Sequence, residues 1–405
     1  MRIKNIYRIF DKLNLNENPM NRVYHFLLLI GLAIPSFAQQ APPQIPTGAK
    51  SAPTNINPND CPCVFEDRRV FFKVNAPDAD KVQIDLGKLY DMEKDDKGIW
   101  TVTTDPQDPG FHYYSVVIDG YKVADPASES FYGMGRMASG IDIPEPGVDF
   151  YDLKDVPHGE IRSRSYFSKT LGAWRNINIY TPPGYDKNTK TSYPVLYIQH
   201  GGGEDERGWV IQGKTSNILD NLIAAGKAVP MIVVIPDGNT QKPGVRGGYN
   251  DEAMAVFREE YFENVIPFIE SNYRVKPGAA NRALAGLSMG GGQAFYTGLR
   301  NTDKFAHVGV FSTGLFGGIA RPDAAAFDPE AVIPGILTNP QSFNSKLKVF
   351  FITVGEQDPR IDHTKKLIDT FKSKGLRVEF ASYPGGHEWQ VWRKSLHDFA
   401  QRIFK

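Results

Sequence analysis

The sequence predicts an α/β protein in which a small all-β sandwich precedes a larger domain, whose mostly parallel sheet carries helices on both faces. Short β-rich runs separated by turn residues fill the earlier part of the chain, which is typical of a sandwich. Apolar runs then alternate with amphipathic stretches, which is typical of a covered parallel sheet. The length of 405 residues allows two or three domains.

Composition and charge limit the class of partner. The chain has 46 Lys and Arg against 46 Asp and Glu, so its formal net charge is zero. Because no bulk field attracts polyanions, nucleic acid is not expected as a partner. Hydrophobic residues at 41% and charged residues at 23% are ordinary for a globular protein with a sizeable core. Nothing in the sequence indicates an oligomeric state.

The first segment has the pattern of a secretory signal. The apolar run Phe26–Ile34 is shorter than the roughly 20 residues that a membrane span requires. It follows Arg22 and is followed by small residues up to Ala38, as in a cleaved signal peptide. We expect residues 1–38 to be leader and signal, with translation starting at Met20 and cleavage near Ala38. The mature protein is then secreted or periplasmic, without a membrane span; the alternative is a buried N-terminal helix.

A linker and a cysteine pair follow the signal. Residues 39–60 are rich in Pro, Ala, Gln and Asn without periodicity, which predicts a flexible linker. Cys61 and Cys63 are the only cysteines, and Pro62 separates them. Two cysteines cannot form a disulfide framework or a four-cysteine zinc site. The sequence allows either two free thiols or one local disulfide between them.

The range 61–150 is predicted to be the β-sandwich. Its expected strands, separated by turns such as Asp95–Gly98, are 70–74, 81–86, 99–104 and 111–118. The segments FKVNAPDADKVQI, GIWTVTT and GFHYYSVVIDG resemble the early-set immunoglobulin-like domain that precedes many carbohydrate-active enzymes. The resemblance implies a domain that packs on a catalytic domain or binds glycan. Because Trp100 falls in a strand pattern where burial is expected, packing is the favoured interpretation.

After a connector at 151–164, the range 165–405 is predicted to be the α/β domain. Apolar runs predict buried strands at 193–200, 230–236, 282–286, 307–312 and 347–355. Helical spacing of apolar residues predicts helices at 215–225, 252–272, 291–300, 364–374 and 392–404.

The strongest chemical signal is the pentapeptide Gly286-Leu287-Ser288-Met289-Gly290. It has the G-x-S-x-G pattern and lies between a predicted strand and a predicted helix, which is the context of a nucleophile elbow. The glycines leave room for a sharp turn that exposes the serine hydroxyl. Ser288 is therefore the candidate nucleophile.

A nucleophilic serine needs a base and an orienting carboxylate, which in α/β-hydrolases follow in the order Ser, Asp or Glu, His. Asp358 follows the strand at 347–355, and His387 lies in a Gly-rich loop before the last helix. Glu356 is the fallback for the acid, whereas Asp237 precedes the serine and breaks the order. The sequence thus predicts a triad of Ser288, Asp358 and His387.

The run His200-Gly201-Gly202-Gly203 follows the first strand of this domain. That position supplies the second backbone donor of an oxyanion hole in α/β-hydrolases. We expect the amides of Met289 and of Gly202 or Gly203 to face the reacting carbonyl. No P-loop or metal-ligand pattern accompanies these residues, so neither cofactor nor metal is expected.

With these residues in place, the domain resembles the feruloyl and acetyl-xylan esterases of the first carbohydrate esterase family, relatives of enterochelin esterases and mycolyltransferases. The matching segments include RNINIYTPPGYD, YPVLYIQHGGGEDERGW, RALAGLSMGGGQAF and PGGHEWQVWRKSLHDFAQRIF. The resemblance gives Ser288, Asp358 and His387 the triad roles.

The resemblance also implies a secreted serine carboxylesterase that releases feruloyl groups from plant cell-wall arabinoxylan through an acyl-enzyme. Acetyl-xylan esterase or dual activity is the close alternative. A siderophore-ester hydrolase, an acyltransferase and an inactive glycan-binding scaffold stay open. Five aromatic residues near the catalytic loops are candidates for stacking on the acid, with core packing equally expected for the last: Trp209, Tyr249, Phe316, Trp389 and Trp392.

Overall fold

The computed structural model describes residues 45–318 and 327–405. The expected leader, signal and cleavage position near Ala38 lie outside the described residues. Among the helices that are described, none is long and apolar enough to cross a membrane.

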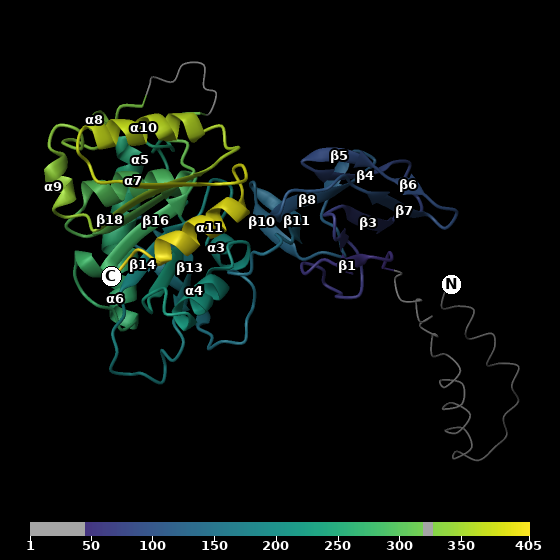
Figure 1. Cartoon of the computed structure of the whole chain (residues 1–405), viewed down its shortest axis with the longest axis horizontal. Helices are drawn as coiled ribbons and strands as arrows, with labels where there is room; N and C mark the ends of the chain where they lie inside the picture. The colour runs from purple at the N-terminus through teal and green to yellow at the C-terminus, as the bar shows by residue number, and fades with distance from the viewer. Residues whose placement is uncertain (1–44, 319–326) are drawn as a thin grey trace, which may run out of the picture. The chain divides into compact units, whose positions relative to one another are not determined.

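The N-terminal part consists of two antiparallel sheets packed face to face (Figure 1). One sheet has the order β1 (Ala49–Ser51), β2 (Cys63–Phe65), β3 (Val70–Asn75), β7 (Ile99–Thr103) and β6 (Glu93–Lys94). The other has the order β10 (Ser130–Gly133), β11 (Arg136–Ile143), β8 (Gly110–Ile118), β4 (Val82–Leu86) and β5 (Lys88–Asp91), with β9 (Tyr121–Val123) paired to β8. Alternate residues such as Phe72, Ile84 and Tyr114 fill the space between the sheets.

Two features near the start of the sandwich refine the sequence-based expectations. Strand β1 lies inside the range 39–60, so the expectation of a linker over that whole range is wrong. Ala49 pairs with Phe65 across the ladder, and these backbone hydrogen bonds order a segment that shows no side-chain periodicity. Cys61 and Cys63 are joined by a disulfide, which resolves the alternative left open.

The larger domain is built on one eight-stranded sheet. Its order is β12 (Glu160–Ser168), β13 (Ala173–Thr181), β15 (Ile232–Pro236), β14 (Val195–Gln199), β16 (Arg282–Leu287), β17 (His307–Phe311), β18 (Val349–Gly355) and β19 (Glu379–Tyr383). Strands β14 to β19 run parallel, and β12 and β13 are antiparallel additions at one edge. Because β12 begins at Glu160, the domain starts before the expected boundary at 165.

Helices cover both faces of this sheet, as the predicted fold class requires (Figure 1). One face carries α3 (Gly208–Ile211), α4 (Thr215–Ala224) and α11 (Trp389–Ala400). The other carries α5 (Asp251–Glu260), the π-helix η1 (Tyr261–Val265), α6 (Ile266–Asn272), α7 (Met289–Arg300) and α10 (Ile361–Ser373). Three short elements complete the domain: η2 (Ala279–Asn281), α8 (Pro329–Val332) and α9 (Pro340–Asn344).

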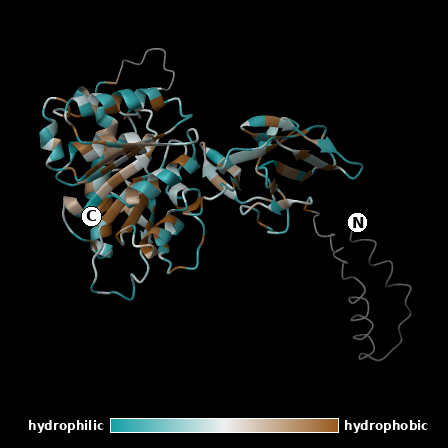
Figure 2. Cartoon of the chain, in the orientation of Figure 1, coloured by the Kyte–Doolittle hydropathy of each residue, from teal (hydrophilic) through white to brown (hydrophobic). Residues whose placement is uncertain are grey.

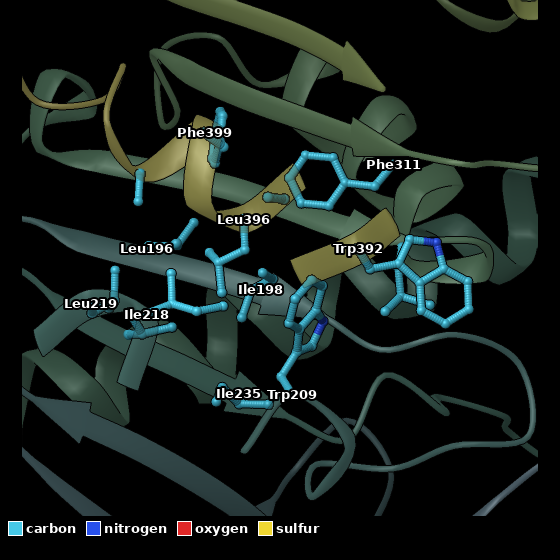
Figure 3. Close-up of a cluster of buried hydrophobic side chains, with 14 of the residues drawn as sticks. Leu196, Ile198, Trp209, Ile218, Leu219, Ile235, Phe311, Trp392, Leu396 and Phe399 are labelled. Atoms are coloured by element: carbon cyan, nitrogen blue, oxygen red, sulfur yellow. The ribbon is translucent and has the colours of Figure 1, made fainter. Parts of the chain in front are cut away.

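Alternation along the central strands fills two apolar layers. Leu196 and Ile198 of β14 pack under α4 and α11, whereas Val195 and Tyr197 pack on the opposite side. Figure 3 shows the first layer, where Trp209 and Leu396 lie among the strand residues. The strands of the sheet are accordingly the most hydrophobic elements of the domain, and the outer helix faces are hydrophilic (Figure 2).

The sandwich and the larger domain contact each other through helix α11. The buried Arg393 guanidinium binds the Asp142 carboxylate of β11 in a bidentate pair, with N–O distances of 3.0 and 2.9 Å. Lys394 pairs with Glu145 at 2.8 Å. This arrangement supports the favoured interpretation of the sandwich as a packing domain.

Candidate active site

The candidate site lies at the carboxyl edge of the parallel strands, where β16 ends at Leu287. Ser288 follows with φ 51° and ψ −111°, a conformation that is strained for a residue with a Cβ. Its N–H donates to the Phe311 carbonyl at 2.8 Å, which holds the turn against β17. A Cβ on Gly286 would lie 2.4 Å from the Gly290 carbonyl, so this turn requires the flanking glycine.

The structure brings the three predicted triad residues into one hydrogen-bonded line. His387 Nε2 lies 2.9 Å from Ser288 Oγ, and His387 Nδ1 lies 2.8 Å from Asp358 Oδ2. Since a carboxylate accepts from Nδ1–H, Nε2 is left to accept the serine proton. This geometry suits a nucleophile activated by a general base.

Asp358 is buried and remains ionised. Burial opposes its ionisation, but hydrogen bonds from His387 and Arg360 outweigh that cost and hold the Asp358 pKa below its usual value. Arg360 Nη1 and the Arg360 backbone N–H both donate to Asp358 Oδ1, at 2.8 and 3.1 Å. Sequence reasoning missed Arg360, although its position two residues after the acid was a usable signal.

The alternative candidates for the acid and the base lie outside this hydrogen-bonded line. The fallback acid Glu356 is exposed, and its carboxylate accepts a hydrogen bond from Ser382. Asp237 pairs with Arg175, and its Oδ1 lies 3.2 Å from His200 Nε2. His200 is buried and accepts a hydrogen bond from the Gly238 N–H, so it joins the ends of two strands.

The two loops that sequence reasoning assigned to the oxyanion hole meet beside Ser288. Met289 begins α7, where the first N–H groups of a helix have no partner within the helix. Gly202 lines the same cavity as Ser288. Gly203 has φ +77°, and its carbonyl accepts a hydrogen bond from the Gly135 N–H of the sandwich at 2.8 Å. Gly202 is therefore the better placed of the two glycine candidates.

Glu204 holds the loop that carries Gly201 and Gly202 in place. Its Oε2 accepts a hydrogen bond from the Gly201 N–H at 3.0 Å, and its Oε1 accepts one from the Tyr113 hydroxyl of the sandwich at 3.3 Å. Burial raises the pKa of the Glu204 carboxyl. Trp389 and Gln212 donate to the same Tyr113 oxygen, at 3.3 and 2.8 Å. Sequence reasoning missed this network because its members are far apart along the chain.

The triad opens into a cavity of about 690 Å³. Both parts of the chain line it. The larger domain contributes Ser288, His387 and Trp392, and the sandwich contributes residues that include His112 and Arg136. The sandwich thus forms a wall of the site, which the sequence did not predict.

The five aromatic candidates divide into three groups. Trp389 and Trp392 line the cavity, and the Trp392 ring packs edge-on against His387 with centroids 5.1 Å apart. The expectation of stacking is wrong for Trp209, which is fully buried and donates to the Gln199 carbonyl, and for Phe316, which packs in the core against Phe295. The Tyr249 hydroxyl contacts the Ser288 and Met289 carbonyls, so this ring lies against the elbow.

Within residues 45–318 and 327–405, no group of three or more His, Cys, Asp or Glu side chains is placed to hold a metal ion.

Comparison with known proteins identifies the family. The Esterase family model matches residues 168–403. The chain belongs to the Esterase family. The resemblance drawn from the sequence motifs is confirmed at this level, as is the α/β-hydrolase fold behind an all-β domain.

Individual relatives of this Esterase-family chain agree with the assignment. The endo-1,4-beta-xylanase/feruloyl esterase of Xylanibacter ruminicola is 37% identical over 365 residues, which cover 87% of this chain and 47% of the relative. The chain thus spans about half the length of that relative. The structure of the ferulic acid esterase of Anaeromyces mucronatus, in complex with ferulic acid, has 28% identity and a TM-score of 0.54, covering 64% of this chain and 96% of that one.

A third comparison concerns the fold alone. The enterobactin esterase of Shigella flexneri is 16% identical, with a TM-score of 0.60, and covers 82% of this chain and 92% of that one. That share is larger than the esterase domain, so the similarity of fold extends into the sandwich.

Proposed function

We propose that this chain is a serine carboxylesterase that hydrolyses feruloyl esters on plant cell-wall arabinoxylan. The observation that carries the proposal is the hydrogen-bonded line Ser288–His387–Asp358 at the wall of a cavity of about 690 Å³. The relatives whose names specify feruloyl or ferulic acid esterase support the choice of acid. The name of the first relative, which includes xylanase, supports the choice of polysaccharide.

The proposed mechanism has two halves. His387 Nε2 takes the hydroxyl proton as Ser288 Oγ attacks the ester carbonyl, and the amides of Met289 and Gly202 stabilise the negative oxygen. The bond between the acyl carbon and the sugar oxygen then breaks, and His387 returns the proton to the departing sugar oxygen. Water then repeats the attack on the acyl-enzyme with His387 as base, which releases the acid and regenerates Ser288. Asp358 stabilises the imidazolium in both halves.

The cavity favours an aromatic acid over an acetyl group. Its volume far exceeds what an acetyl group occupies, and Trp392, which packs against His387, lines it beside the base. Acetyl-xylan deacetylation is the second candidate, because an acetyl ester fits the same catalytic geometry. His112 and Arg136 also line the cavity, and in this proposal they contact the sugar side of the ester.

Export is part of this proposal. An insoluble cell-wall polymer is accessible outside the cytoplasm, and the sequence pattern up to Ala38 is that of a cleaved signal. The mature protein is accordingly proposed to be secreted or periplasmic.

Product analysis tests the function. The purified protein and its Ser288→Ala variant are incubated with feruloylated and acetylated arabinoxylan, and each free acid is quantified by chromatography. Ferulate released by the wild type alone supports the proposal, and acetate alone transfers the assignment to acetyl-xylan esterase. Release of neither acid contradicts both and favours a siderophore ester, acyl transfer or a binding scaffold.

A further inference from the structure

An exposed aromatic pair lies on the hairpin of β12 and β13, away from the triad. Trp174 is 72% exposed and Phe167 is 50% exposed. Their ring centroids are 5.8 Å apart at an interplanar angle of 75°, so the two rings pack edge to face. The other four tryptophans are at most 6% exposed. A tryptophan left this exposed on a sheet indicates a binding surface.

The pair is one end of an ordered row. Antiparallel register places Phe167 opposite Trp174, and the next two pairs on the same face are Ser with Asn. We call this row the hairpin strip, and it consists of Phe167, Trp174, Ser165, Asn176, Ser163 and Asn178. At about 3.4 Å per residue, the row extends over about 14 Å.

The polar part of the strip is hydrogen-bonded and concave. Ser165 Oγ donates to Asn176 Oδ1 at 3.1 Å, and Ser163 Oγ donates to Asn178 Oδ1 at 2.6 Å. Asn178 Nδ2 donates to the Glu206 carbonyl at 3.0 Å. Together with Arg207, these residues line a shallow hollow of about 430 Å³.

The strip lies at the catalytic edge of the sheet. Ile177 of β13 pairs with Pro236, the last residue of the antiparallel neighbour β15, so Trp174 lies beyond the carboxyl end of that strand. Ser288 also follows the carboxyl end of a strand in this sheet. At the other end of the strip, the Arg207 guanidinium lies 5.4 Å from the centre of the Tyr132 ring of the sandwich.

The hairpin is held rigidly from behind. Tyr166 and Ser168, which alternate with Phe167, are buried, and both donate to the Glu260 carboxylate of α5. Arg175 Nη2 donates to the Asp237 carbonyl at 2.6 Å. A surface fixed in this way loses little conformational entropy when a ligand binds.

We propose that the hairpin strip binds the unesterified main chain of the polysaccharide. The indole face matches the C–H face of a sugar ring, and the exposed side chains of Ser163, Ser165 and Asn176 match sugar hydroxyls. Asn178 is buried and holds the far end of the strip in place. The six side chains are uncharged, which suits a neutral glycan, and the charged residues that line the hollow beside them, Arg164, Glu206 and Arg207, can also bind sugar hydroxyls. The identity of the glycan rests on the proposed function. Pairing of the edge strand β12 with a second copy is disfavoured, since Arg162 and Arg164 lie on that strand.

The test measures binding without turnover, in the full chain carrying Ser288→Ala. Affinity for unesterified soluble xylan is measured by affinity electrophoresis and by titration calorimetry for Trp174→Ala, Trp174→Phe and Tyr121→Ala. Tyr121 is the matched control, because it is 77% exposed on the sandwich and lies outside the strip. We expect Trp174→Ala to weaken binding about ten-fold. Trp174→Phe should retain most of the affinity, and Tyr121→Ala should leave it unchanged.

Three outcomes would overturn the strip as a glycan site: no binding of xylan to the parent protein, equal binding by Trp174→Ala, or a dimer that dissociates in Trp174→Ala. The last would assign the strip to contact between two copies, and light scattering detects it. Thermal unfolding of each variant confirms folding. If Trp174→Ala does not fold, Trp174→Gln takes its place, with the same loss of affinity expected and retained affinity again overturning the site. Since no ester is cleaved, failure of the strip is distinguishable from failure of the esterase proposal.

Discussion

Asp358 accepts hydrogen bonds from two sides, and these hydrogen bonds keep it ionised. Its Oδ2 faces His387 and its Oδ1 faces Arg360, so neither oxygen is left without a donor in a buried position. The same donors keep its pKa low despite burial. The carboxylate therefore remains charged at neutral pH, as it must if it is to stabilise a protonated His387.

Replacing Asp358 by Asn should lower kcat by about a thousand-fold or more, because an amide can stabilise the wrong imidazole tautomer and carries no charge. Steady-state kinetics on a chromogenic ester measure the change. The control is Glu356→Gln, two residues away and exposed, which should stay close to wild-type activity. A large loss in Glu356→Gln with little loss in Asp358→Asn would assign the acid to Glu356.

Glu204 should act as a positioning residue. Glu204→Ala removes the acceptor of the Gly201 N–H, so the next amide, that of Gly202, loses its fixed direction. We expect kcat to fall about ten-fold, less than for loss of an oxyanion donor itself, with little change in KM. Asp205→Asn, in the same loop and paired with Arg207, is the control and should leave kcat unchanged. If Glu204→Ala raises KM and leaves kcat unchanged, Glu204 contributes to substrate binding and does not position the amide of Gly202.

At the scale of elements, the elbow between β16 and α7 depends on close backbone contact. A Cβ on Gly290 would lie 2.5 Å from the His200 carbonyl oxygen. The clash could be relieved only by moving the backbone, which costs more than moving a side chain. A Cβ on Gly298, in the same helix, would meet only the Val308 side chain at 2.8 Å. The two glycines thus have different structural roles within one helix.

Gly290→Ala should therefore destabilise the protein by about 2–4 kcal/mol and abolish esterase activity. Gly298→Ala should destabilise the protein less than Gly290→Ala, because only the Val308 side chain must shift and better helix propensity of up to about 1 kcal/mol offsets part of that cost. Urea unfolding and ester hydrolysis measure both effects. Equal stability of the two variants would contradict the importance of this contact.

Elements were predictable where residue patterns are local. Buried parallel strands such as Val349–Gly355 are continuous apolar runs, and they stand out from sequence alone. Strands β12 and β13 were not predicted as strands, because an edge hairpin alternates buried residues with Ser, Asn and Arg. The triad was predictable from motifs and chain order. The Tyr113–Glu204 contact was not, since it depends on how two domains pack.

At the scale of the whole molecule, one buried histidine links folding to pH. Burial lowers the pKa of His307 from 6.5 to about 4. Between these values the unfolded chain binds a proton that the folded chain does not. The stabilisation is therefore complete above pH 6.5 and is lost as the pH falls towards 4. The shift corresponds to about 3 kcal/mol.

His307→Gln keeps a donor for the Ala280 carbonyl but does not titrate. From about pH 7 to about pH 4, the free energy of unfolding of the wild type should fall by about 3 kcal/mol more than that of this variant. Urea titrations at both pH values measure the difference, with the exposed His363→Gln variant expected to follow the wild type. Parallel pH profiles for wild type and His307→Gln would contradict this assignment.

The hydrogen bond from the Gly135 N–H to the Gly203 carbonyl limits how the two domains can be separated by gene recombination. The loop of the esterase domain that carries the proposed oxyanion donor Gly202 is held by the sandwich, so a recombination breakpoint between the two domains would remove that support. Gene fusions that exchange modules should therefore carry both domains as one block. The alignment with the Xylanibacter ruminicola protein agrees with this, because it runs over 87% of this chain within a polypeptide about twice as long.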